Sequence, residues 1–194
     1  MRKKIKHKIR KKLSGSRGFS LGELLAATII LLLASQVMAE GVTFAVRMYN
    51  QVLTRSQGKQ LCSTLTGSIE TELRYATSIT YDENNGELLN YFSPIYGQTQ
   101  SSFLSIDDAE KEVTGGELAI RVKDADGRVA YQKLISGSAY SSFGLKAKAE
   151  TRYDKSSNIF TVTLTILDKN NQEQTENRFH VIPVNVLKIH QSNS

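Results

Sequence analysis

Hydrophobic and polar residues follow two different periods along this chain, and the change falls near Ser78. The residues from 24 to 39 carry no charge, and apolar residues at helical spacing continue beyond them. Proline breaks helix interiors, and none occurs between Phe19 and Ser93. The pattern therefore predicts a helical region from Phe19 to about Ser78.

The apolar face of this predicted helix changes side across residues 55–59. The first apolar set comprises Val42, Phe44, Val46, Met48, Tyr49, Val52 and Leu53. The second comprises Leu61, Cys62, Leu65, Ile69, Leu73 and Ala76. At 100° per residue, the centres of the two sets differ by about 140°. Either the chain forms two separate helices of an ordinary membrane-anchored domain, or one helix packs its two halves against different surfaces.

Cys62 is the single cysteine, and it belongs to the second apolar set. This placement predicts a small buried side chain. An intermolecular disulfide is the alternative for an odd cysteine in an extracellular protein.

Beyond Ser78 the pattern becomes that of strands. Residues 158–168 alternate threonines with Phe160, Val162, Leu164 and Ile166, which predicts a half-buried antiparallel strand. Its expected partner is 176–189, indicated by Phe179, Val181 and Val184, with Pro183 at an edge or bulge. Further strands are predicted at 87–92, 102–106, 117–123, 128–135 and 145–153. The turn 124–127 joins two of them as a hairpin. The expected fold class is α+β.

The charge of the chain is concentrated at its start. The 194 residues have a formal net charge of +6, but nine of the 25 basic residues lie in residues 1–18. The remainder holds 16 basic and 19 acidic residues. A mildly acidic body without a basic stripe indicates no direct nucleic-acid binding.

Signals of catalysis and metal binding are missing from the sequence. It contains no G-x-S-x-G, P-loop or G-x-G-x-x-G motif, and His7, His180 and His190 lie far apart. We therefore expect no enzyme activity, no catalytic residues, no cofactor and no metal site. Residues 82–87 resemble a calcium loop only faintly and predict a surface turn. Asp124 and Asp126 could bind calcium, but the predicted hairpin already accounts for them.

A basic block followed by an apolar run is an export or membrane signal with its basic end in the cytosol. An ordinary secretory signal peptide is one interpretation. Its apolar region would be 24–33, and small residues at 37–39 would allow cleavage before Glu40.

The junction between the two segments reads Gly18-Phe19-Ser20-Leu21-Gly22-Glu23-Leu24-Leu25. It resembles the cleavage motif of type IV prepilins and pseudopilins. The resemblance implies that a prepilin peptidase cleaves after Gly18 and N-methylates Phe19. It also implies that Glu23 pairs with the amino-terminal amine of a neighbouring subunit. Gly22 departs mildly from the family pattern, as does the absence of a proline near Glu40.

Span lengths agree with a special position for Glu23. The uncharged stretch 24–39 would extend about 24 Å as a helix, short of a hydrocarbon core of about 30 Å. Starting at Phe19 gives about 31 Å and places the Glu23 carboxylate inside the membrane boundary, where an acid needs a partner. A span of 24–46 would embed Glu40 instead. We favour the first span because Arg17 and the leader then lie in the cytosol.

The resemblance implies four segments: a cleaved leader at 1–18, a transmembrane and filament-core helix at 19–39, an amphipathic helix at 40–78 and a β-rich domain at 79–194. The expected protein is a pilin-like structural subunit, a minor pilin or pseudopilin. Its partners would be the peptidase, other pilin or pseudopilin subunits and the cytoplasmic membrane. Its globular domain would lie outside the cell, then on a filament or the cell surface. The alternative is a monomeric membrane-tethered extracellular binding domain that does not assemble.

Overall fold

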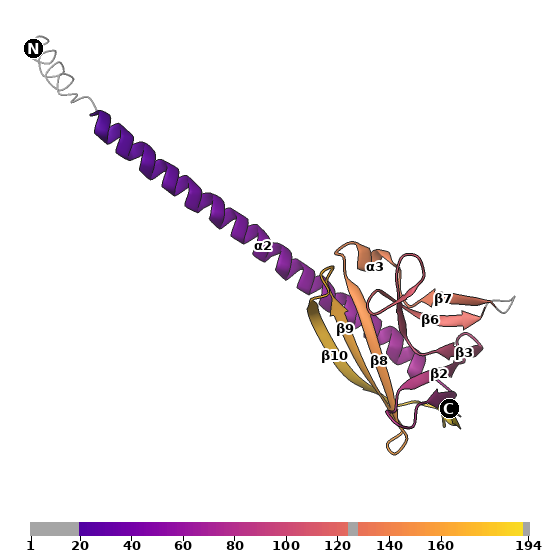
Figure 1. Ribbon diagram of the computed structural model, residues 1–194. Helices are drawn as coiled ribbons and strands as arrows, with labels where there is room; N and C mark the ends of the chain where they lie inside the picture. Colours follow the sequence, from indigo (N-terminus) through magenta and orange to yellow (C-terminus); the bar gives the residue numbers. More distant parts are fainter. Residues whose placement is uncertain (1–19, 124–127, 192–194) are drawn as a thin grey trace, which may run out of the picture. The chain divides into compact units, whose positions relative to one another are not determined.

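The computed structural model describes residues 20–123 and 128–191. Contacts within the chain divide it into two compact units, Met1–Tyr49 and Asn50–Ser194. Helix α2 (Leu21–Arg74) begins in the first unit and ends in the second (Figure 1). It is continuous across residues 55–59, so the two-helix alternative is wrong.

Helix α2 ends four residues earlier than the pattern predicts, and β1 already begins at Ser78. A loop near the carboxyl terminus of the chain meets the helix end. The Val184 amide donates to the Arg74 carbonyl (2.8 Å), and the Asn185 side chain donates to the Tyr75 carbonyl (3.0 Å). These bonds satisfy carbonyls that a helix terminus leaves without partners.

Within the second unit, α2 buries the apolar set that the sequence indicates. Its buried members are Leu61, Cys62, Leu65, Ile69 and Leu73, with Ala76 buried just beyond the helix. Helix and sheet approach closely at Gly58, where a Cβ atom would lie 3.4 Å from the Gln174 Cβ. Cys62 is a free, buried cysteine, as predicted, and burial raises the pKa of its thiol.

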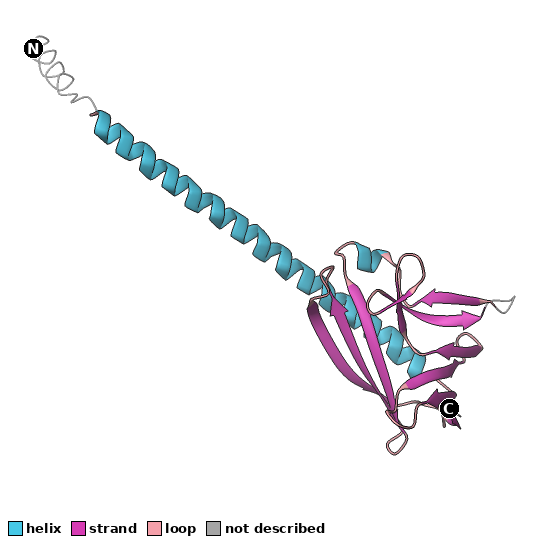
Figure 2. Cartoon of the chain, in the orientation of Figure 1, coloured by secondary structure: helices cyan, strands magenta, loops and turns pink. Residues whose placement is uncertain are grey.

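Three long antiparallel strands form the sheet closest to the predicted pattern (Figure 2). They are β8 (Lys146–Asp154), β9 (Ile159–Leu167) and β10 (Glu173–Val181), in the order β10-β9-β8. On β9, Phe160, Val162, Leu164 and Ile166 are fully buried. The alternation in the sequence is thus confirmed as the inward face of the central strand.

Two four-stranded sheets complete the described part of the second unit. One has the order β11-β1-β2-β3 and the other β5-β4-β6-β7. Their strands are β1 (Ser78–Tyr81), β2 (Leu88–Ser93), β3 (Gln98–Ser101), β4 (Leu104–Ile106), β5 (Glu112–Val113), β6 (Glu117–Lys123), β7 (Val129–Lys133) and β11 (Lys188–Gln191). A short helix, α3 (Ser138–Ser141), follows β7. The expected α+β class with antiparallel sheets is confirmed, apart from one parallel pair, β1 with β11.

The expected strand 176–189 is wrong in its extent. The strand at this place, β10, ends at Val181, and the chain joins a different sheet as β11. Pro183, which lacks an N–H group, lies between them. Val184 does not face the core: its side chain is 67% exposed, because this segment leaves the sheet to meet the end of α2.

The expected hairpin is confirmed in its two strands, β6 and β7, which pair from Ala119 with Lys133 to Lys123 with Val129. Its turn, with Asp124 and Asp126, lies outside the described residues. The segment 82–87 is a surface turn, as predicted. The Asp82 carboxylate accepts the Asn84 amide, and Gly86 adopts a positive φ of 74°.

Candidate functional site

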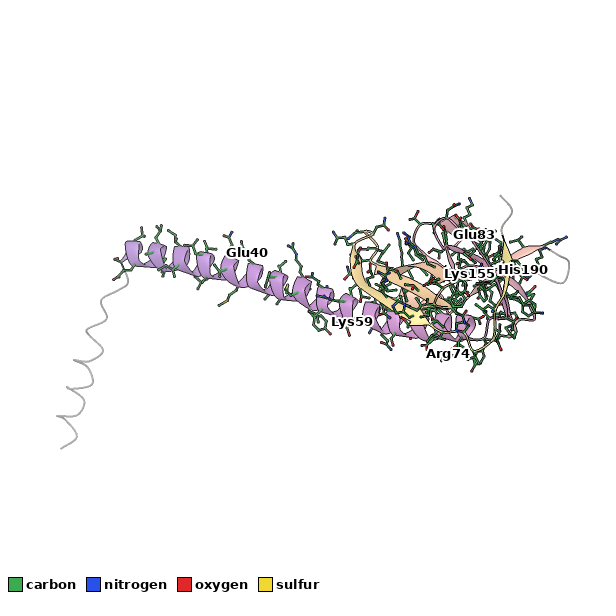
Figure 3. All side chains as sticks on the ribbon, turned by 90° about the horizontal axis from the view of Figure 1, so that it is seen from below. Glu40, Lys59, Arg74, Glu83, Lys155 and His190 are labelled. Carbon is green, nitrogen blue, oxygen red and sulfur yellow. The ribbon has the colours of Figure 1, made fainter. Side chains whose placement is uncertain are left out.

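The first unit presents a helical surface of exposed apolar side chains. Large apolar side chains are exposed all around it: Leu21, Leu24, Leu25, Ile29, Ile30, Leu31, Leu32, Leu33, Val37, Met38, Val42, Phe44 and Val46. Figure 3 shows side chains projecting on all sides of this part of the helix, Glu40 among them. By length and composition, α2 contains a stretch able to cross a membrane. A signal sequence near the amino terminus meets the same criteria of length and composition.

Hydroxyl groups within the apolar stretch are bonded to the helix itself. Thr28 donates to the Leu25 carbonyl (2.8 Å), and Ser35 donates to the Leu32 carbonyl (2.8 Å). Such bonds remove the need for water as a partner, which matters because hydrocarbon offers no hydrogen-bonding groups. These two hydroxyl groups are therefore compatible with a lipid environment.

Glu23 lies in the first turn of α2 and forms a reciprocal cap with Ser20. The Ser20 amide donates to Glu23 Oε2 (3.0 Å), and the Glu23 amide donates to Ser20 Oγ (3.2 Å). The Leu24 amide donates to the Ser20 carbonyl (3.1 Å), so Ser20 is the N-cap residue. This arrangement is a capping box, which satisfies amides that a helix start leaves unpaired. Its S-x-x-E signature is present in the sequence but was not part of the sequence prediction.

The remaining predicted site residues, Gly18 and Phe19, lie outside the described residues. The cap nevertheless constrains any role of Glu23. One carboxylate oxygen, Oε2, already has a donor within the same chain, and no hydrogen bond to Oε1 occurs within the described part of the chain. The side chain can therefore keep its cap while Oε1 accepts from a further donor.

A second polar feature, which the sequence did not reveal, is the buried carboxylate of Glu72 near the end of α2. Its side chain is 6% exposed. Oε2 accepts from Ser93 Oγ (2.9 Å) and from the Tyr91 hydroxyl (3.4 Å), both on β2. Burial raises the pKa of Glu72, opposed by these two hydrogen bonds. Within the described residues no basic side chain forms an ion pair with it.

This burial predicts a pH-dependent gain in stability for Glu72→Gln. At acid pH the carboxyl group is neutral in the folded and unfolded chain, and the two proteins should be similar. As the pH rises above the unfolded pKa, ionisation is harder in the folded state, so the wild type loses stability and the variant does not. Glu72→Gln should therefore be more stable than the wild type at pH 8, and the difference should disappear at acid pH.

Urea unfolding of both full-length proteins in detergent, between pH 4 and pH 8, measures this difference. Glu70→Gln is the matched control, because Glu70 is partly exposed and pairs with Arg74 on the same helix. The stability of the Glu70→Gln control relative to wild type should not increase with pH. A difference in unfolding free energy between wild type and Glu72→Gln that does not change with pH would contradict the prediction.

Metal-binding chemistry has no evident place among the described residues, which contain no group of three or more His, Cys, Asp or Glu side chains able to hold an ion. Comparisons with protein-family models, curated proteins and solved structures gave no significant match. The case for a function therefore depends on the chain's own residues.

Proposed function

We propose that the chain is a type IV pilin-like structural subunit, a minor pilin or pseudopilin, processed and N-methylated by a prepilin peptidase. Its role would be non-enzymatic. The observation that supports this most directly is the continuity of α2. One helix exposes apolar side chains in the first unit and buries a different apolar face against the sheets of the second. A subunit needs the first surface for lipid and then for neighbouring helices, and the second for its own fold.

The proposal places the amino terminus in the cytosol and the β-rich unit outside, because the basic leader remains on the cytosolic side. After cleavage the helix would be the single membrane anchor. Its exposed apolar side chains could later pack against other pilin or pseudopilin helices without a change in the fold of the second unit.

One observation favours the alternative, a tethered extracellular binding domain that does not assemble. The Ser20–Glu23 cap gives the carboxylate a donor within its own chain, so no second subunit is needed to provide the first hydrogen bond. The two functions differ in whether Phe19 becomes a methylated amino terminus and whether Glu23 has an intermolecular partner.

Processing tests the proposal. We expect membrane-extracted protein to begin with N-methylated Phe19, as measured by amino-terminal mass spectrometry in cells that contain a prepilin peptidase. Gly18→Glu should keep the leader on nearly all of the protein, since it places a charge and a large side chain at the cut. A mature terminus at Glu40 would instead identify an ordinary signal peptide. Normal cleavage of the Gly18→Glu protein would also contradict the assignment.

A further inference from the structure

A cleft of about 440 Å³ lies beside the last turns of α2, in the second unit. The helix provides Thr64, Gly67, Ser68, Thr71 and Glu72 as lining residues. Tyr96 and Leu134, from segments that follow β2 and β7, line the rest. The proposed filament role makes no use of this cleft, which contains the buried Glu72 carboxylate.

The three hydroxyl groups that the helix places in the cleft donate their hydrogens to carbonyls of the helix itself. Thr64 donates to the Gln60 carbonyl (3.1 Å), Ser68 to the Thr64 carbonyl (3.2 Å) and Thr71 to the Gly67 carbonyl (2.8 Å). A hydroxyl has one hydrogen and two acceptor lone pairs. Each of these oxygens can therefore only accept a further hydrogen bond.

Glu72 adds a charge to this set of acceptors. Its Oε2 is occupied by the donors Ser93 and Tyr91, while no hydrogen bond to Oε1 occurs among the described residues. A buried carboxylate without a cation is unfavourable. The helical side of the cleft thus combines a carboxylate oxygen with three hydroxyl oxygens whose hydrogens are already bonded to the helix, an arrangement that suits a ligand with several donors and a positive charge.

We propose that this cleft binds the ammonium group of a lysine side chain from a partner protein. An ammonium has three donors and no acceptor, which matches the hydroxyl oxygens and Glu72 Oε1. A guanidinium binds carboxylates best through both oxygens, and here one oxygen is occupied. Apart from the Tyr96 hydroxyl, an anion would meet acceptors and a like charge.

The other lining residues suit the stem of a lysine. No described atom lies within 4 Å of the position that a Cβ would take at Gly67, so the helix surface is open there. Leu134 offers apolar contact to methylene groups, and Tyr96 is 37% exposed, which leaves its ring accessible to a cation. The inference does not depend on the filament proposal.

The test uses the full-length protein in detergent and Nα-acetyl-lysine N-methylamide as the probe, with binding followed by saturation-transfer NMR. We expect saturable binding in the millimolar range, which suits a single side chain. The Nε-acetylated probe, which lacks the charge, should bind at least tenfold more weakly, and the arginine analogue should also bind more weakly.

Two variants that change the cleft and should still fold test whether binding occurs there. Glu72→Gln removes the charge, and Gly67→Leu fills the cleft while replacing a glycine with a better helix former. Both should weaken lysine-probe binding at least tenfold, whereas the control Glu70→Gln should not. Unfolding curves verify that each variant is folded. No saturable binding by the folded wild type would overturn the proposal. So would equal binding of the acetylated or arginine probe, or unchanged binding by folded Glu72→Gln or Gly67→Leu protein.

Discussion

Replacing Glu23 with alanine is expected to remove most of the protein from sheared filaments while its amount in the membrane stays unchanged. Insertion should not suffer, because an acid in hydrocarbon is unfavourable and its removal makes insertion easier. Assembly should suffer because the proposed cleavage between Gly18 and Phe19 would release an amine, and the amine of a neighbouring subunit would lose its counter-charge. Leaving one charge of a fully buried pair without a partner costs about 3–5 kcal/mol.

The capping box allows the charge of Glu23 to be tested separately from its capping hydrogen bond, which the alanine substitution alone does not. Glutamine at position 23 keeps an acceptor for the Ser20 amide, as capping boxes with Gln do, but has no charge. Ser20→Ala removes the opposite bond, from the Glu23 amide to Ser20 Oγ, and keeps the carboxylate. If the charge of Glu23 acts in assembly, Glu23→Gln should be excluded from filaments as Glu23→Ala is. Ser20→Ala, which keeps the charge, should enter filaments.

The measurement is the ratio of sheared-filament protein to total membrane protein for each variant, at equal processing of Phe19. A Glu23→Gln protein that enters filaments as well as wild type would assign the residue to helix capping alone. Equal incorporation of Glu23→Ala would remove Glu23 from the assembly mechanism and favour the tethered monomer. A pair between Glu23 and the amine of its own chain, one turn away, would also favour the monomer.

Sequence patterns were informative where a single element determines burial. The apolar set from Leu61 to Leu73 and the alternation on β9 each repeat with the period of their own secondary structure. Each set therefore identifies a buried face without knowledge of its partner. Buried Cys62 follows from the same reasoning, since it lies within the helical set.

Long-range contacts explain what the patterns missed. β1 and β11 pair in parallel although more than 100 residues separate them, and each strand is only four residues long. The Val184 amide donates to the carbonyl of Arg74, the last residue of α2, and no local signal reveals this contact. Glu72 lies next to Leu73 on the helix and would be expected to face water, but hydroxyl groups of Tyr91 and Ser93 on β2 allow its burial.

The Ser20–Glu23 cap is different, because its signature is local and could have been found in the sequence. The prepilin-like motif covers the same residues and implies an intermolecular role for Glu23. The two roles are compatible, since a capping bond to one carboxylate oxygen leaves the other able to accept. Gly18 and Phe19 remain predictions from the motif.

The largest expected effect on stability is that of Phe160→Ala. Phe160 is fully buried on β9, and its ring centroid lies 5.1 Å from that of Tyr153, which in turn lies 5.3 Å from that of Tyr81. These rings join the β10-β9-β8 sheet to β1 of the neighbouring sheet. Truncation of a buried phenylalanine costs about 3–5 kcal/mol, a large share of the roughly 5–15 kcal/mol that stabilises a typical domain.

Urea unfolding of the full-length protein in detergent, followed by tyrosine fluorescence, measures the loss. Phe160→Leu keeps most of the volume and should cost less than about 1.5 kcal/mol. Val129→Ala changes an exposed strand residue and should stay within about 0.5 kcal/mol of wild type. Because α2 buries its second apolar set in the same core as Phe160, Phe160→Ala should also make the Cys62 thiol react faster with a thiol reagent. A Phe160→Ala protein as stable as Val129→Ala, with Cys62 equally protected, would mean that the sheets and the helix do not share one core.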